Sequence, residues 1–205
     1  VSRIDPQKNQ LALVELMANL NARKGTKKEE KTENNGVVKD YHLVLVGPCT
    51  NVNYLDQIVA TIAQRDLKES VTLISGLQPE SIALKDVYQS ADIFVLPSVH
   101  EPFGIVVLEA WAAGLPVIAS RLGGLAKLID DQKNGLHFNP FKPSSLFDVI
   151  VNLEKNPLLE KRIGARGQKE AKTQYSWENY TKRLVQFYED VERWHRSKAS
   201  KALNP

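Results

Sequence analysis

The chain has 205 residues, 42% hydrophobic and 25% charged, which is enough for the core of one α/β domain and too little for two full ones. A formal charge of +3, from 27 Lys and Arg against 24 Asp and Glu, is too small and dispersed for a nucleic-acid-binding protein. The single Cys49 excludes an internal disulfide framework and a cysteine-built metal site. Because no apolar run is long enough to span a membrane and no signal-peptide pattern opens the chain, we expect a cytoplasmic protein. Any membrane association would be peripheral and made through a domain outside this chain.

The start of the chain, Val1-Ser2-Arg3, is typical of the end of a buried strand, which suggests a fragment of a larger protein. Apolar residues then recur at helical spacing: Leu11, Val14, Leu16 and Leu20. They predict a helix that begins near Pro6 to Lys8, with Asp5 as its N-cap. Residues 23–40, dense in Lys, Glu, Asn, Thr and Gly, predict a disordered surface excursion because they have no apolar periodicity.

Five apolar runs follow and alternate with helical segments. The expected strands are 42–46, 71–74, 93–96, 116–119 and 135–138. The expected helices are 52–65, 79–90, 104–113, 125–130, 144–154, 158–173 and 177–198. This alternation predicts an α/β, Rossmann-like domain over residues 1–196, with a doubly wound parallel sheet and a frayed tail at 197–205.

Ligands of such folds bind at the carboxyl ends of the strands, where this chain carries two glutamates eight residues apart. Glu101 lies in the turn after the third strand and Glu109 in the helix that follows. Their spacing suits two carboxylates that accept hydrogen bonds from different sugar hydroxyls along one crevice. Between them, Gly104 allows close approach of a ligand, and the amides of Gly104, Ile105 and Val106 lie at a helix N-terminus suited to phosphate.

Two cations are expected at the same edge of the sheet. Arg3 ends the first strand and Lys8 begins the following helix, so both could clamp a diphosphate that the glutamates would otherwise repel. Either residue alone would be read as a solvated charge. Together with the glutamates and the glycine turn, they favour an anion site.

Three blocks of sequence resemble one family: residues 2–9, residues 101–109, and residues 114–120 followed by Gly123-Gly124. In this order they are similar to the C-terminal domain of retaining GT-B glycosyltransferases, a group that includes sucrose synthases and sucrose-phosphate synthases. The resemblance covers Val1 to Trp194, apart from the excursion. It implies a domain that binds a UDP-, ADP- or GDP-sugar donor, needs no metal or other cofactor, and works with an N-terminal acceptor domain.

Carried over by position, the resemblance implies a role for each site residue. Arg3 and Lys8 would bind the donor diphosphate and, with Glu101 on the transferred sugar, form the catalytic set. The donor-binding residues would be Gly76, Leu77, Phe103, Gly104, Ile105, Val106 and Glu109. Within this set, Glu109 would contact the ribose hydroxyls and the turn at Gly76 the base. The resemblance also implies retention of the anomeric configuration by a front-face route, and an isolated domain that binds nucleotide without turnover.

Two positions depart from the family pattern. Lys127 stands where an acidic residue is common, so it either faces solvent or reaches a different acceptor. Lys8-Asn9 stands where many relatives have Lys-Gly, a form associated with the sucrose-related branch. Trp111 is expected in the core rather than against a ligand.

Three alternatives stay open at this point: a Rossmann dehydrogenase, a nucleotide-sugar epimerase of GT-B architecture, and a non-enzymatic nucleotide-binding or interaction module. The dehydrogenase lacks its Gly-x-Gly-x-x-Gly turn. An interaction module would use the apolar stripe of the last helix, formed by Trp177, Tyr180, Leu184, Phe187, Tyr188, Val191 and Trp194.

Overall fold

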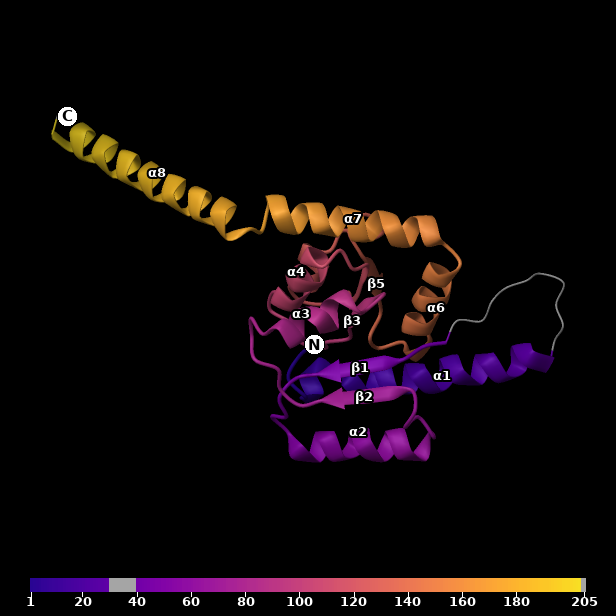
Figure 1. Cartoon of the computed structure of the whole chain (residues 1–205). Coiled ribbons are helices and arrows are strands. Elements are labelled where there is room, and N and C mark those ends of the chain that lie inside the picture. The colour runs from indigo at the N-terminus through magenta and orange to yellow at the C-terminus, as the bar shows by residue number, and fades with distance from the viewer. Residues whose placement is uncertain (30–39, 204–205) are drawn as a thin grey trace.

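The computed structural model describes residues 1–29 and 40–203, in which strands alternate with helices (Figure 1). The strands are β1 (Leu43–Val46), β2 (Val71–Ile74), β3 (Phe94–Leu96), β4 (Val117–Ser120) and β5 (Leu136–Phe138). The helices are η1 (Pro6–Lys8), α1 (Gln10–Glu29), α2 (Val52–Gln64), α3 (Ile82–Gln89), α4 (Ile105–Ala112), α5 (Leu125–Leu128), α6 (Pro143–Glu154), α7 (Pro157–Thr173) and α8 (Trp177–Leu203). The α/β class is therefore confirmed.

The strands pair in parallel, as expected, but in two sheets rather than one. Among the described residues, β1 pairs with β2, and β4 lies between β3 and β5. No ladder of backbone hydrogen bonds joins β1 to β3 among the described residues, and residues of both strands line a cavity of about 760 Å³. The start of the chain pairs with the end of β1 through Ser2 N to Val46 O at 2.8 Å and Ile4 N to Pro48 O at 2.9 Å. This pairing is strand-like, as expected for Val1-Ser2-Arg3, but Val1 and Ser2 are only partly buried and Arg3 is exposed.

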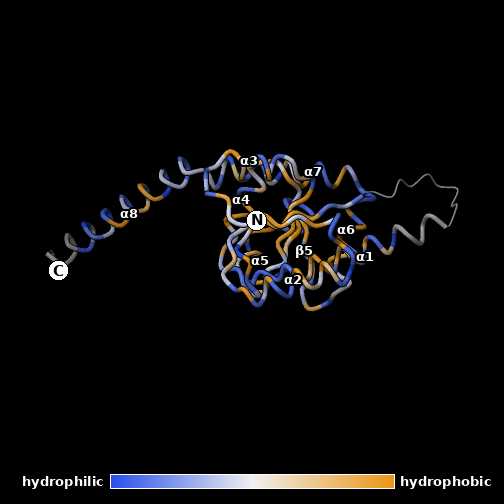
Figure 2. The backbone as a smooth tube through the Cα atoms, turned by 60° about the horizontal axis from the view of Figure 1, so that its bottom comes forward, coloured by the Kyte–Doolittle hydropathy of each residue, from blue (hydrophilic) through white to orange (hydrophobic). Residues whose placement is uncertain are grey.

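Two apolar clusters form the core, and Figure 2 shows hydrophobic residues gathered on the strands at the centre. One cluster joins α1, α2, β1 and α6 around the fully buried Ile58. The other joins β3, β4, α4 and α5 around Val107 and Trp111, both with no exposed surface. All four residues of β4 are buried, as a strand covered on both faces requires. The expectation that Trp111 belongs to the core is confirmed.

Two glycines of α7 let that helix lie directly on α4. A Cβ on Gly167 would come within 2.3 Å of the Trp111 ring, and one on Gly164 within 2.6 Å of the Gly114 carbonyl oxygen. Since even alanine would overlap these atoms, α7 can approach α4 and the turn that follows it this closely only with glycine at both positions. The contact fixes α4, the helix that carries Glu109.

Helices α1 and α8 extend further than their sequences suggest. Helix α1 continues to Glu29, so the start of the excursion at residue 23 was placed too early; an ion pair of 2.6 Å from Arg23 Nη1 to Glu154 Oε2 ties this part of the helix to α6. Residues 30–39 lie outside the described part of the chain. Helix α8 projects away from the body and reaches Leu203, so residues 197–203 are helical rather than frayed (Figure 1). None of the helices in the described ranges has the length and apolarity that a membrane span demands.

Candidate active site

Lys8 enters the site from η1, a short helix with a defined start and end. Asp5 caps it by accepting a hydrogen bond from Gln7 N at 2.9 Å. Asn9 ends it with φ at +54°, in the left-handed region that glycine adopts freely and asparagine tolerates. Asparagine can therefore replace the glycine of the Lys-Gly form without moving Lys8.

The ammonium group of Lys8 meets the carboxylate of Glu101. Lys8 Nζ lies 2.7 Å from Glu101 Oε2, and the two side chains are only 13% and 12% exposed. A lysine ammonium has three donors, and the bond to Glu101 occupies one of them. The other two remain able to bind an anion beside the carboxylate.

Backbone hydrogen bonds hold the loop that carries Glu101. Val99 N donates to Gln7 O at 2.9 Å, which joins the loop to η1. Ser120 Oγ donates to Ser98 O at 2.5 Å, which joins the loop to the end of β4. The meeting of Lys8 with Glu101 is thus imposed by the backbone as well as by their charges.

The turn at Gly123-Gly124 packs against the same loop. Gly124 N donates to Glu101 O at 2.8 Å. A Cβ on Gly123 would lie 2.5 Å from Glu101 O, and one on Gly124 would lie 2.1 Å from Pro102 O. Only glycine fits this approach, which explains the third sequence block in structural terms. Lys127, four residues past Gly123, is exposed on α5.

Helix α4 presents an uncapped N-terminus next to Glu101. Gly104 has φ at +99°, and a Cβ there would lie 2.8 Å from the Leu125 side chain. No side chain caps the helix, so its first amides and the positive end of its dipole are available to a ligand. Phe103 and Ile105, on either side of Gly104, are 45% and 66% exposed, whereas Val106 is half-buried.

Glu109 is held by a residue that the sequence did not suggest. Tyr88 Oη, at the end of α3, donates to Glu109 Oε2 at 2.6 Å. The Tyr88 ring is buried, whereas Glu109 is exposed on α4. Burial, and secondly the hydrogen bond to Glu109, raise the pKa of Tyr88 well above its usual range, so it remains a donor. The sequence contained one indication of this contact: a tyrosine on the core-facing side of a helix has a buried hydroxyl, and a buried hydroxyl needs an acceptor.

Arg3, Gly76 and Leu77 lie at the same carboxyl edge without touching the glutamates. Arg3 lies between Ser2 and Ile4, whose amides pair with the end of β1. It is exposed, and its carbonyl oxygen accepts a hydrogen bond from Gln10 Nε2 at 2.6 Å. Gly76 follows β2 with φ at +57°, and open space surrounds it where a Cβ would stand. The described contacts join Lys8 to Glu101 but join neither Arg3 nor the Gly76-Leu77 turn to Glu101 or Glu109.

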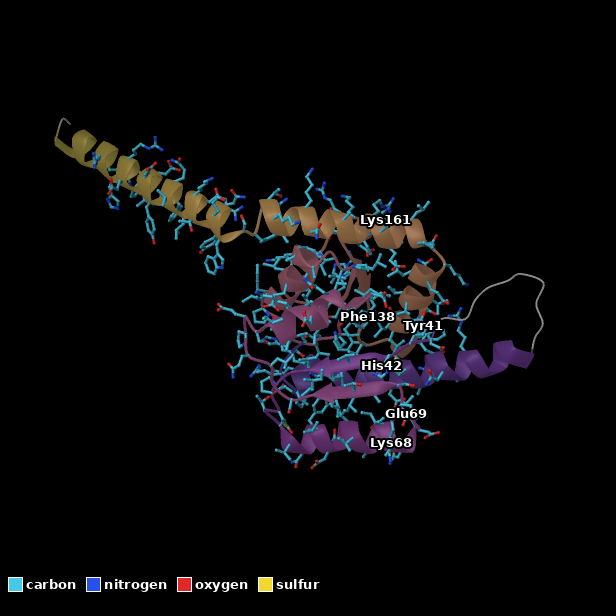
Figure 3. The ribbon with its side chains drawn as sticks, viewed as in Figure 1. Tyr41, His42, Lys68, Glu69, Phe138 and Lys161 are labelled. Carbon is cyan, nitrogen blue, oxygen red and sulfur yellow. The ribbon has the colours of Figure 1, made fainter. Side chains whose placement is uncertain are left out.

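The structure shows two hollows among its described residues, and the larger one borders this site through Lys8 and Tyr88. Of the predicted site residues, Lys8 alone lines the cavity between β1 and β3. A second hollow, of about 440 Å³, includes Tyr41, His42 and Glu69 at the amino ends of β1 and β2, the opposite edge of that sheet (Figure 3). The candidate site is therefore an open rim, which we define as Lys8, Glu101, the first turn of α4 and Glu109. Within the part of the chain that the structure covers, no three His, Cys, Asp or Glu side chains gather as a metal site.

Comparison with known proteins identifies the family. The model of the glycosyl transferases group 1 family matches residues 1–170. The chain belongs to this family. An uncharacterised glycosyltransferase of Methanocaldococcus jannaschii is 34% identical over 146 residues, 71% of this chain and 36% of the relative. D-inositol 3-phosphate glycosyltransferase of Corynebacterium urealyticum is 34% identical over 126 residues, 61% of this chain and 29% of the relative.

Solved glycosyltransferase structures share the fold. Anabaena HepE in complex with UDP and glucose superposes with a TM-score of 0.75 over 92% of this chain and 47% of HepE, at 18% identity. Sucrose-phosphate synthase of Thermosynechococcus elongatus gives a TM-score of 0.73 over 94% of this chain and 45% of the synthase, at 26% identity. The chain thus spans about a third of the length of the first curated relatives and just under half of these structures.

Proposed function

We propose that this chain is the donor-binding domain of a retaining glycosyltransferase, which transfers a hexose from a nucleoside diphosphate sugar to an acceptor hydroxyl. One observation carries the proposal: Lys8 meets Glu101 beside the uncapped N-terminus of α4. A cation, helix amides and an acidic acceptor of sugar hydroxyls then lie together. These are the groups that a sugar linked to a diphosphate requires.

Each part of the donor has a counterpart on the rim. The diphosphate would lie between the two unoccupied donors of Lys8 and the amides of Gly104 to Val106, with Arg3 reaching it from the end of β1. Glu101 would accept from hydroxyls of the transferred sugar, and Glu109 from those of the ribose. The Gly76-Leu77 turn would face the base, because the turn is exposed at the same sheet edge.

In the reaction, the bond from the anomeric carbon to the diphosphate oxygen breaks with its electron pair on the oxygen. Lys8, Arg3 and the α4 amides would stabilise the charge that develops on this leaving group. The acceptor oxygen would form its bond on the same face and pass its proton to the leaving phosphate, which retains the configuration. Glu101 and Glu109 bind hydroxyls in this scheme and are not the facing acid and nucleophile of a hydrolase.

The acceptor would be recognised by another domain of the same enzyme, so this chain alone should bind nucleotide without turnover. Relatives that include sucrose synthase 1 of Hordeum vulgare and mannosylfructose-phosphate synthase of Agrobacterium fabrum support a sugar or sugar phosphate as acceptor. A lipid-linked or glycan acceptor is the alternative. We place the reaction in the cytoplasm.

Calorimetry with UDP, ADP and GDP tests the proposal. We expect one of the three to bind, and Lys8→Met to weaken that binding by about tenfold or more through the loss of a charged contact to phosphate. Lys182→Met, on the exposed part of α8, is the matched control and should bind as the parent does. If the folded chain gives no heat with any of the three, the proposal is wrong.

A further inference from the structure

Tyr88 and Glu109 form a hydrogen bond between two different helices at the rim. The distance from Tyr88 Oη to Glu109 Oε2 is 2.6 Å. Within the described ranges, no other side chain or amide hydrogen-bonds to Glu109. The amino terminus of Val1 also interacts electrostatically with Glu109. Among the described contacts, the second carboxylate oxygen, Oε1, accepts no hydrogen bond and can accept one from a ligand.

The two residues differ in mobility because they differ in surroundings. Tyr88 is 6% exposed and belongs to the second apolar cluster, where its ring lies 5.9 Å from that of Phe94. Glu109 is exposed on α4, and a glutamate in that setting samples several rotamers. A hydrogen bond from a fixed phenol selects one of them, so α3 determines where the carboxylate of α4 points.

A carboxylate held in this way suits a pair of adjacent hydroxyls. One oxygen is occupied by Tyr88, and the remaining acceptor sites have a fixed direction. A ribose offers its 2′- and 3′-hydroxyls as two neighbouring donors. A site built to accept from a hydroxyl discriminates against an analogue that lacks it, because the acceptor is then left without a partner.

We propose that Tyr88 is a positioning residue that sets the preference of this domain for ribonucleotides over 2′-deoxyribonucleotides, through the orientation it imposes on Glu109. The inference rests on the proposed function, since it assigns the ribose to Glu109. It adds a residue from a third element, α3, to the rim formed by η1 and α4.

Binding of UDP, 2′-deoxy-UDP and pyrophosphate to the chain and to Tyr88→Phe tests this. The parent should bind UDP about tenfold or more tighter than 2′-deoxy-UDP, as one well-placed hydrogen bond to a charged acceptor implies. Tyr88→Phe keeps the buried ring, so it should weaken UDP binding by about threefold to tenfold and leave pyrophosphate binding unchanged. Binding of 2′-deoxy-UDP, which keeps only the 3′-hydroxyl for Glu109, should weaken by less. The ratio of the UDP affinity to the 2′-deoxy-UDP affinity should therefore fall towards one.

Further variants separate this role from a structural one. Glu109→Gln, an exposed position outside the core, should lose the same preference, and the double variant Tyr88→Phe/Glu109→Gln should lose no more than either alone. Tyr180→Phe, half-exposed on α8, should retain the full preference.

If Tyr88→Phe weakens the binding of all three ligands equally, Tyr88 has a structural role and the inference is overturned. An unchanged ratio of the UDP affinity to the 2′-deoxy-UDP affinity would also overturn it. Failure of the parent to bind UDP, ADP and GDP alike would instead overturn the proposed function. Because the parent and the variant are measured separately, the two failures are distinguishable.

Discussion

The ion pair between Lys8 and Glu101 should be visible in the stability of the domain. Exposed pairs contribute about 0 to 1 kcal/mol, whereas breaking a buried pair costs about 3 to 5 kcal/mol because one charge stays buried alone. With side chains 13% and 12% exposed and a separation of 2.7 Å, this pair lies close to the buried limit. We expect Lys8→Met to lower the free energy of unfolding by about 2 to 3 kcal/mol.

Glu101→Gln should cost less, about 1 kcal/mol, since the long Lys8 side chain can turn its ammonium towards water. The double variant Lys8→Met/Glu101→Gln leaves no charge without a partner. It should therefore be more stable than Lys8→Met alone by about 1 kcal/mol or more.

Urea unfolding followed by circular dichroism measures these differences, and with a slope of about 2 to 3 kcal/mol per molar the Lys8→Met midpoint should fall by about 1 M. The exposed pair of Lys182 with Glu178 on α8 is the matched control, with an expected coupling below about 0.5 kcal/mol. If the double variant loses as much stability as the two single variants together, to within about 0.3 kcal/mol, then Lys8 and Glu101 do not interact and the rim is not assembled as described.

Three further changes test the surroundings of the rim. Gly124→Ala should destabilise the domain by about 2 kcal/mol or more and weaken nucleotide binding, measured by urea unfolding and calorimetry, because the new Cβ would meet Pro102 O at 2.1 Å. Gly167→Ala should lower the melting temperature, measured by thermal unfolding, since it displaces Trp111 in the core. Burial and a neighbouring carboxylate raise the pKa of Tyr88 above the unfolded value, so stability should fall as pH rises past about 10; Tyr88→Phe should reduce that slope by about 1.4 kcal/mol per pH unit in urea unfolding.

The sequence predicted features that depend on local chemistry. Short apolar runs bounded by Gly or Pro identified all five strands, because a strand covered on both faces must be apolar throughout. The rule that ligands bind at the carboxyl ends of strands directed attention to Lys8 and Glu101, and these two residues do meet. Gly104 was expected to allow a close approach at the start of α4, and its φ of +99° is a conformation that glycine adopts freely.

What the sequence did not predict depends on contacts between distant residues. Tyr88 and Glu109 are 21 residues apart on different helices, and no local pattern distinguishes this tyrosine from another buried one. The division of the strands into two sheets was also not predicted, because apolar strand patterns do not encode which strands pair. Helix α1 continues past residue 23, where Arg23 pairs with Glu154 on α6, and the polar sequence of this segment gives no sign of that contact.

The central claim is that a nucleoside diphosphate binds at the rim, and amide chemical shifts measured during a UDP titration test it most directly. Shifts concentrated at Gly104, Ile105 and Val106, with smaller ones at Gly76 and Leu77, are the predicted result. Shifts confined to the cavity between β1 and β3, with the first turn of α4 unaffected, would contradict the account.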